Sequence, residues 1–299
     1  MTSASVSNDT ATSPGLPASL ELGAVRLIVT DLDRSIAFYR DVIGLLPAMS
    51  SEAHCCMLSS EDGSVVLELE ARADAERAGM HAGLYHVALL APSRRELANM
   101  VLRIIATRTP VQGASEHHTH EAIYLADPDG NGLELACDWP QSQWPSVRDF
   151  EAMRPDPLDV DDLLKQADPS NVPAHAGPGL RVGHLHLHVG DIAEARAWYE
   201  GVIGFDPIMQ IPTASFMSVG GYHHHLAVNT WKGEGAPAVP TTAVGMRWWT
   251  VRVPSVADID ALAARLNEAN AAYQRVSASC LDVADRWGNV MRCMKMLDE

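Results

Sequence analysis

Internal repetition is the feature that most restricts the fold of this 299-residue chain. The sequence VTDLDRSIAFY at 29–39 returns as VGDIAEARAWY at 189–199, and each copy is followed two residues later by V-I-G and an apolar residue. Each copy reads as a strand that ends at an Asp, then an amphipathic helix, then a Gly at the end of the helix. Repetition on this scale predicts a fold assembled from similar supersecondary units.

A second pair of repeats completes the pattern. GLYHVALLAPS at 83–93 matches GMRWWTVRVPS at 245–255, and each reads as a strand that leads into a helix. The predicted helices lie near residues 94–106 and 256–270. The resulting prediction is an α+β fold of four βαβββ modules, numbered here in chain order, which span residues 22–72, 82–138, 180–230 and 244–296.

The modules fall into two halves that a connecting segment separates. The N-terminal half covers residues 21–138 (modules 1 and 2), and the C-terminal half covers 179–299 (modules 3 and 4). The connecting segment, 139–178, is rich in Pro and Asp, and its stretch 158–164 predicts a short surface helix. Residues 1–20 are rich in Ser, Thr, Ala and Pro, with neither a basic start nor an apolar centre. We therefore expect a disordered tail there and not a signal peptide.

Composition excludes several classes of partner. Asp and Glu number 38 against 22 Lys and Arg, a net charge of −16, which argues against nucleic acid and against an anionic membrane surface. No apolar run reaches the length of a membrane span. The five cysteines form no CxxC spacing and no paired framework, which favours reduced thiols in the cytoplasm.

A carboxylate set into an apolar strand is the first sign of chemistry. In EAIYLADPDGNGLELAC, residues 121–137, one predicted strand runs into a dense turn and a second strand follows. Glu134 has a Leu on each side and therefore points to the opposite face from both. If that face is the interior, the charge must be paired or bound to a metal. The alternative is a solvent-facing Glu on a half-exposed strand.

Together these features resemble the vicinal oxygen chelate superfamily, and within it the two-domain extradiol ring-cleaving dioxygenases of the catechol 2,3-dioxygenase-like type. The short module motifs and the DPDGNGLEL turn are shared with glyoxalases, epimerases and drug-binding proteins. GGYHHHLAV at 220–228 and VGHLHLH at 182–188 are similar to the extradiol enzymes specifically. The resemblance covers nearly everything from residue 22 onward. It implies a metal between two paired modules, held by residues of their first and last strands.

Matching the modules residue by residue places three candidate ligands in two different halves. His86 and Glu134 occupy the first-strand and last-strand positions of module 2, and His184 occupies the first-strand position of module 3. An indole is no ligand and a guanidinium repels a cation, so modules 1 and 4 offer none. Their equivalent positions hold Ala24, Trp248 and Arg292.

We therefore hypothesise that module 2 pairs with module 3 across the two halves, and that modules 1 and 4 form a structural pair. This departs from the usual extradiol pattern, in which modules 3 and 4 supply all three ligands. Pairing of module 1 with module 2 would leave His86 and Glu134 with only Glu68 as a third candidate. Two His and one carboxylate suit non-haem Fe(II), with Mn(II) possible, and leave open positions for both catechol oxygens and O2. The alternative for any single His on an apolar strand is a hydrogen-bonded core residue.

The resemblance also implies groups that handle protons or contact the substrate. His224 matches an acid–base His, and imidazole titrates near neutrality, so it can accept a catechol proton and return one later. Tyr124, ten residues before Glu134, matches a pocket Tyr, and His117 is the favoured pocket His, with His118 as the second candidate. A polar surface loop is the alternative for His118 and His120. His186 and His188 are read as spare ligands or as groups that hydrogen-bond the ligands, and structural or hydrogen-bonding roles are favoured for His223 and His225.

The leading hypothesis is a cytoplasmic Fe(II)-dependent extradiol dioxygenase that opens a catecholic ring with O2. A glyoxalase-like metal-dependent lyase or isomerase would use the same fold without consuming O2. A metal-free, drug-sequestering binding protein is the third hypothesis. A homo-oligomer is possible, and the ring substituents of the substrate are open.

Overall fold

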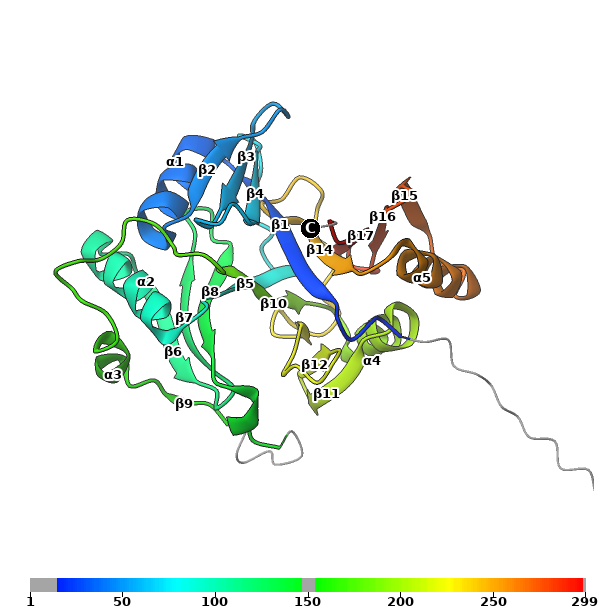
Figure 1. The fold of residues 1–299 in the computed structure, drawn as a ribbon. Helices are drawn as coiled ribbons and strands as arrows, with labels where there is room; N and C mark the ends of the chain where they lie inside the picture. Colours follow the sequence, from blue (N-terminus) through cyan, green and yellow to red (C-terminus); the bar gives the residue numbers. More distant parts are fainter. Residues whose placement is uncertain (1–14, 147–153, 298–299) are drawn as a thin grey trace, which may run out of the picture.

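The computed structural model describes residues 15–146 and 154–297. Within this part of the chain, all four predicted βαβββ modules are present, and the helices lie at the periphery of two mixed sheets (Figure 1). Among the described residues, no helix is both long and apolar enough to cross a membrane.

Modules 1 and 2 form the N-terminal half. Module 1 consists of β1 (Glu21–Val29), α1 (Leu32–Phe38), the π-helical turn η1 (Tyr39–Ile43), β2 (Leu46–Met49), β3 (Cys55–Ser59) and β4 (Val65–Ala71). Module 2 consists of β5 (Gly83–Leu90), α2 (Arg94–Thr107), β6 (Val111–Glu116), β7 (His120–Ala126) and β8 (Gly132–Asp138). The connecting segment contributes η2 (Gln141–Gln143), β9 (Asp156–Pro157) and α3 (Val160–Leu164), and α3 confirms the predicted short helix.

Modules 3 and 4 repeat this order in the C-terminal half. Module 3 consists of β10 (Arg181–His188), α4 (Ile192–Trp198), the π-helical turn η3 (Tyr199–Ile203), β11 (Asp206–Ile211), β12 (Ala214–Ser218) and β13 (Leu226–Asn229). Module 4 consists of β14 (Gly245–Val253), α5 (Val256–Glu268), β15 (Tyr273–Ser277), β16 (Cys280–Ala284) and β17 (Val290–Lys295).

The repeated motifs have local physical causes. In every module the residue before the main helix is an Asp or a Ser whose side chain accepts a hydrogen bond from the backbone N–H three residues later. This satisfies a backbone donor that the helix leaves free. The V-I-G triplets end in Gly44 (φ 93°) and Gly204 (φ 98°), in the left-handed region that glycine adopts without strain.

The repeated tyrosines and turn aspartates join the modules of each half. The Tyr39 hydroxyl donates to Asp127 Oδ2 in the turn of module 2 (3.1 Å), and Tyr199 donates to Asp285 Oδ2 in the turn of module 4 (2.9 Å). Each Asp also accepts from backbone and Asn amides of its own turn. The two motifs that recur in the sequence are therefore the two ends of one buried hydrogen bond.

Strand pairing crosses the two halves, as hypothesised. β5 pairs antiparallel with β10, so modules 2 and 3 share a nine-stranded sheet in the order β11-β12-β13-β10-β5-β8-β7-β6-β9. β1 pairs antiparallel with β14, so modules 1 and 4 share an eight-stranded sheet in the order β15-β16-β17-β14-β1-β4-β3-β2. In each module the first strand runs parallel to the last. The central strands are thus the ones that carry the candidate ligands.

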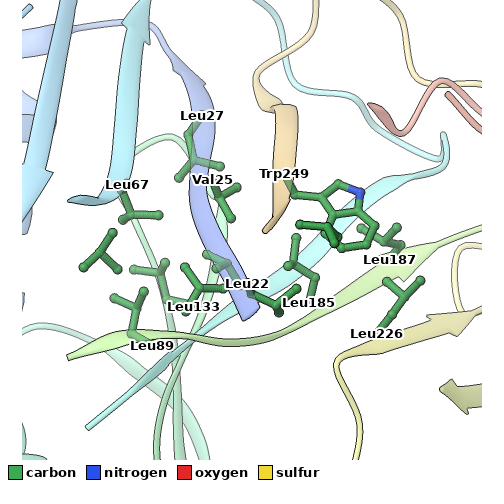
Figure 2. Close-up of a cluster of buried hydrophobic side chains, with 14 of the residues drawn as sticks. Leu22, Val25, Leu27, Leu67, Leu89, Leu133, Leu185, Leu187, Leu226 and Trp249 are labelled. Atoms are coloured by element: carbon green, nitrogen blue, oxygen red, sulfur yellow. The ribbon is translucent and has the colours of Figure 1, made fainter. Parts of the chain in front are cut away.

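The apolar core lies where the inner faces of the two sheets meet. Figure 2 shows side chains of β1, β4 and β14 directed toward side chains of β5, β8, β10 and β13. Leu185 and Leu187 of β10 belong to this core and are fully buried. Side chains alternate along a strand, so the intervening His184 and His186 point to the other face. Burial of the leucines in the core therefore fixes the face on which the histidines gather.

One predicted boundary is wrong. Residues 15–20, assigned to a disordered tail, are ordered: Leu16 and Leu20 are buried in the core, and the Leu16 N–H donates to the Gly204 carbonyl (2.9 Å). Burial of these two leucines offsets part of the entropy that the short segment loses when it becomes ordered. Residues 1–14 of that tail lie outside the described residues.

Candidate metal centre

Three neighbouring strands bring the predicted ligands together. Glu134 on β8 and His184 on β10 flank the same residue of β5, Ala88, and His86 lies two residues before it. Glu134 Oε2 lies 3.1 Å from His86 Nε2 and 3.2 Å from His184 Nε2, and the donor atoms of all three residues lie within 4.8 Å of one another. All three side chains are buried.

Two donor atoms of this group have no hydrogen-bond partner, whereas His184 Nε2 and Glu134 Oε2 are hydrogen-bonded to each other (3.2 Å). His86 Nε2 and Glu134 Oε1 are buried and have no hydrogen bond of acceptable geometry, despite their short contacts. Unpaired buried polar atoms are costly, and a bound cation would satisfy both. Two imidazole nitrogens and one carboxylate are a donor set that suits a divalent transition metal. The residues present therefore fit a metal ion.

The charge states also favour a cation. Burial lowers the pKa of His86 to about 3, so the imidazole is neutral at physiological pH. Burial alone would raise the pKa of Glu134, but the surrounding histidines, His184 foremost, outweigh it and hold that pKa well below its usual range. Neutral imidazole and ionised carboxylate are the forms in which these side chains bind metals.

Tyr124 and His117 form a pair on the cavity wall beside this group. Tyr124 lies directly opposite Glu134 on the neighbouring strand β7, and its hydroxyl is 2.8 Å from His117 Nε2. Burial lowers the pKa of His117 to about 4 and raises the pKa of the Tyr124 phenol far above its usual value. His118 points elsewhere, because its Nε2 donates to the Arg154 carbonyl (3.1 Å). Of these two histidines, His117 lines the cavity.

His224 reaches the same cavity and is tied to a chain of polar groups. Its ring centroid lies 4.1 Å from that of His184, and its Nδ1 lies 2.9 Å from His223 Nδ1. His223 Nε2 in turn donates to Asp138 Oδ1 (3.1 Å), and the Tyr222 hydroxyl donates to Asp138 Oδ2 (2.9 Å). Asp138 is the last residue of β8, four residues after Glu134. This series of hydrogen bonds therefore links module 2 to module 3.

His120 is a site residue to which the sequence analysis gave no role. Its Nε2 lies 3.0 Å from Glu134 Oε1, and its Nδ1 accepts from the Thr119 hydroxyl (2.9 Å). A signal was available: on strand β7, residues 120, 122 and 124 share one face, so His120 follows Tyr124 toward the cavity. The strand predicted from the sequence covers Ala122 to Ala126, two residues short of His120, and this hid the relation.

A second group of potential ligands, His120, Asp138 and His223, does not have the geometry of a chelate. Its donor atoms lie within 4.8 Å of one another, but the rings of His120 and His223 are stacked, with centroids 4.7 Å apart and planes 14° apart. Imidazole lone pairs lie in the ring plane, so two parallel stacked rings cannot both point at one ion. The planes of His86 and His184 differ by 67°, which permits convergence.

The remaining histidines have distinct surroundings. His186 lines the cavity, and its buried Nε2 has no hydrogen-bond partner among the described residues. His188 donates from Nδ1 to Asn229 Oδ1 (2.7 Å), and His225 Nδ1 contacts the Ser218 hydroxyl (2.7 Å). The last two are thus engaged by module 3 itself.

The three candidate ligands and several of the histidines described above line a cavity of about 530 Å³ on the outer face of the nine-stranded sheet. Its polar floor is made of the histidines, Tyr124 and Glu134, and an apolar wall faces them. The full lining is Tyr85, His86, His117, Thr119, His120, Tyr124, Glu134, Arg154, Pro155, His184, His186, Ile208, Met209, Ile211, Phe216, His223, His224 and Trp231.

The equivalent place in the other sheet is filled instead. The guanidinium of Arg292 lies 4.0 Å from the ring centroid of Trp248, and that of Arg26 lies 4.5 Å from the same centroid. Arg292 makes two 2.8 Å hydrogen bonds to Asp282. Arg26 pairs with Glu52 and, at 3.2 Å, with Glu70. Two cations stacked on an indole replace the candidate ligands.

Comparison with known proteins defines the class. The chain matches the Glyoxalase/Bleomycin resistance protein/Dioxygenase superfamily over residues 21–135 and 181–279, and it belongs to that superfamily. It is 36% identical over 265 residues to the catechol-2,3-dioxygenase of Bacillus subtilis (strain 168), a match that covers 86% of this chain and 91% of that protein.

Solved structures agree on the fold. The crystal structure described as a putative dioxygenase from Bacillus subtilis subsp. subtilis str. 168 aligns with this chain with a TM-score of 0.64 and 12% identity. The alignment covers 92% of this chain and 84% of that chain. Glyoxalase I from Zea mays aligns with TM-score 0.57 and 13% identity over 93% of this chain and 92% of that chain. At these identities the likeness concerns the fold alone, and it confirms the vicinal oxygen chelate architecture.

Proposed function

We propose that this protein is an extradiol dioxygenase that opens a catecholic ring with O2 at a non-haem Fe(II) held by His86, Glu134 and His184. The observation that carries the proposal is the convergence of three buried donors, two of them unsatisfied, from three adjacent strands. The similarity to the catechol-2,3-dioxygenase of Bacillus subtilis supports the reaction class. Mn(II) fits the same donors.

When bound, the metal supplies open positions for both catechol oxygens and for O2, and it acidifies the catechol hydroxyls. The carboxylate of Glu134 offsets part of its charge. His120 Nε2 lies 3.0 Å from the other carboxylate oxygen, where it would support the ligand carboxylate, as groups behind metal ligands commonly do.

His224 is proposed to accept and return the proton. Asp138 accepts the N–H of His223 Nε2, which leaves His223 Nδ1 as an acceptor for the N–H of His224 Nδ1. The other nitrogen of His224, Nε2, then carries the lone pair. The chain of hydrogen bonds thus fixes the tautomer in which His224 can act as a base.

Tyr124 and His117 are proposed to orient the reacting oxygens. Their 2.8 Å contact fixes the phenol on the wall beside Glu134, and burial keeps the phenol protonated and able to donate a hydrogen bond. A neutral donor placed there can stabilise charge that develops on an oxygen. Apolar side chains, Met209 and Phe216 among them, line the opposite side of the cavity.

One experiment separates the candidate reactions. The protein is purified without oxygen, its iron and manganese are counted, and oxygen uptake is followed with catechol. We expect about one iron per chain and oxygen consumption coupled to formation of a coloured ring-opened product. A stoichiometric metal without oxygen uptake would favour the glyoxalase-like lyase or isomerase, and catechol binding without metal would favour the sequestering protein. Cytoplasmic location is proposed with it, since all five cysteines are free thiols.

A further inference from the structure

One hairpin of module 3 builds an apolar wall in the cavity. Ile208, Met209 and Ile211 of β11 and Phe216 of β12 line it. Met209 and Ile211 share one face of the strand by alternation, and Met209 pairs directly with Phe216. A register shift after Pro207 inserts Ile208 as an extra residue, and such bulges re-aim side chains. The irregular strand thus presents three aliphatic side chains to the cavity instead of two.

Two aromatic side chains continue this wall at the cavity mouth. Tyr85 and Trp231 are 38% and 49% exposed, and their rings meet edge to face with centroids 5.2 Å apart. The indole N–H of Trp231 donates to the Thr213 hydroxyl (3.1 Å), and its backbone N–H donates to Asn229 Oδ1 (3.0 Å). Trp231 is therefore held in place. Apolar rings fixed at an open edge gain free energy when a ligand covers them.

The wall adjoins the proposed catalytic groups without a gap. Phe216 lies with its ring centroid 5.3 Å from that of His224 and 5.9 Å from that of His186, and Trp231 lies 5.1 Å from His186. A ring held near His224 would therefore present its substituents to Phe216 and Trp231. The wall lies within reach of a substrate and forms part of the same cavity.

The charges of the cavity disfavour an anionic substituent. Among the described residues that line it, the acidic and basic side chains other than the histidines are Glu134 and Arg154. Glu134 belongs to the proposed metal site, and Arg154 is exposed, next to Pro155. No cation is set among the aliphatic and aromatic residues of the wall. A substrate carboxylate placed there would be desolvated without a partner.

We propose that the cavity selects catechols that carry an uncharged apolar substituent, such as an alkyl chain, and discriminates against carboxylated catechols. The selecting residues are Ile208, Met209, Ile211, Phe216 and Trp231. This inference rests on the proposed function, since it takes the metal-bound catechol ring as the anchor from which the substituent extends.

The test compares kcat/KM for catechol, 4-methylcatechol, 4-propylcatechol and 3,4-dihydroxybenzoate in oxygen-uptake assays. Burial of one methylene is worth about 0.8 kcal/mol, which corresponds to about a fourfold gain in kcat/KM. We expect kcat/KM to rise by about this factor per added carbon and to fall at least about tenfold for the carboxylate. Equal or higher kcat/KM for 3,4-dihydroxybenzoate than for 4-propylcatechol would overturn the proposal.

Two variants connect the preference to the wall. Phe216→Ala should lower the ratio of propylcatechol to catechol activity, and Met209→Lys should move the preference toward the carboxylate. Met49→Ala is the matched control, because Met49 is an exposed residue of β2 in the other sheet. An unchanged ratio in both wall variants, with folding checked by circular dichroism, would contradict the assignment. So would a carboxylate preference that Arg154→Gln removes.

A binding measurement separates this proposal from the proposed reaction. If no catechol supports oxygen uptake, the dioxygenase proposal fails, but calorimetric titration of the protein as purified, without oxygen, still ranks the same four ligands. Tighter binding of 4-propylcatechol than of catechol, and weakest binding of the carboxylate, would support the selecting wall. The reverse order would overturn it.

Discussion

The four central strands have the same arrangement in both sheets: β13-β10-β5-β8 in one and β17-β14-β1-β4 in the other. The residues at the centre of this shared framework differ. In the sheet of modules 2 and 3, His186 pairs in register with His86 across β10 and β5. In the sheet of modules 1 and 4, Arg26 pairs with Trp248 at the equivalent place. The first centre is open, with unsatisfied buried nitrogen and oxygen atoms. The second is occupied by two guanidinium groups stacked on one indole.

The comparison shows that three substitutions distinguish the proposed metal site from the equivalent place in the other sheet. His184 is replaced by Ala24, His86 by Trp248 and Glu134 by Arg292, while strand order and direction stay the same. Both arginines are paired with carboxylates of modules 1 and 4, Asp282 among them, so neither cation is left without a counter-charge. We infer that one framework serves for chemistry and the other for stability, and the following predictions test that contrast from the largest expected effect to the smallest.

Removal of the Glu134 carboxylate should abolish metal binding in the sheet of modules 2 and 3. Glu134→Ala removes the one anionic donor. Mutation of residues that only support metal ligands already lowers metal affinity by about 10–100-fold. We expect a loss of more than about 100-fold in iron affinity, and no measurable oxygen uptake. Metal analysis after anaerobic gel filtration measures it. Arg292→Ala, at the equivalent position of the other sheet, is the matched control and should keep its iron. Full iron occupancy in Glu134→Ala would show that the ligands are assigned wrongly.

Replacement of the proposed base should separate turnover from metal binding. His224→Phe should keep near-normal iron and still bind catechol, but turn over about 10²–10⁴-fold more slowly, the usual contribution of a general acid–base group. Iron content is measured beside oxygen uptake. His225→Phe, the adjacent residue engaged by Ser218, serves as the control. Normal turnover in His224→Phe would remove it from the mechanism, and lost iron would make it a ligand.

Asp138 should affect turnover only by fixing, through His223, which nitrogen of His224 carries the proton. Asp138→Asn lets the amide donate to His223, which reverses the polarity of the hydrogen-bond chain. We expect kcat to fall about 10–100-fold, as for other groups behind an active centre, with KM and iron content unchanged. Tyr222→Phe removes the other hydrogen bond to Asp138 and should have a smaller effect. A change in KM equal to the change in kcat would indicate a structural role instead.

Reversal of a charge in the filled centre should cost stability without creating chemistry. Arg292→Glu removes a two-bond pair with Asp282 and sets like charges together, so the free energy of unfolding should fall by about 1–3 kcal/mol. Denaturant titration measures the loss. No second iron should bind, because Ala24 and Trp248 still supply no donor. A second stoichiometric iron would contradict the contrast between the two centres.

Sequence repetition predicted the modules and the crossed pairing, because complementary residues at matched strand positions identify which modules can share a metal. It could not predict the series of hydrogen bonds that joins Asp138, His223 and His224. These bonds depend on where the end of β8 meets the loop before β13. Alternation along the strand with Tyr124 could have placed His120 on the cavity side, but its stacking with His223 depends on the fold. Leu16 and Leu20 were missed because two leucines in a polar segment carry no periodic signal.

Diffraction at the iron absorption edge tests the central claim most directly. Crystals of the anaerobically loaded protein should show one anomalous peak per chain, bonded to His86 Nε2, His184 Nε2 and the Glu134 carboxylate, and none beside Trp248 and Arg292. A peak bonded to other residues, or a loaded protein with no peak between β5, β8 and β10, would contradict the account.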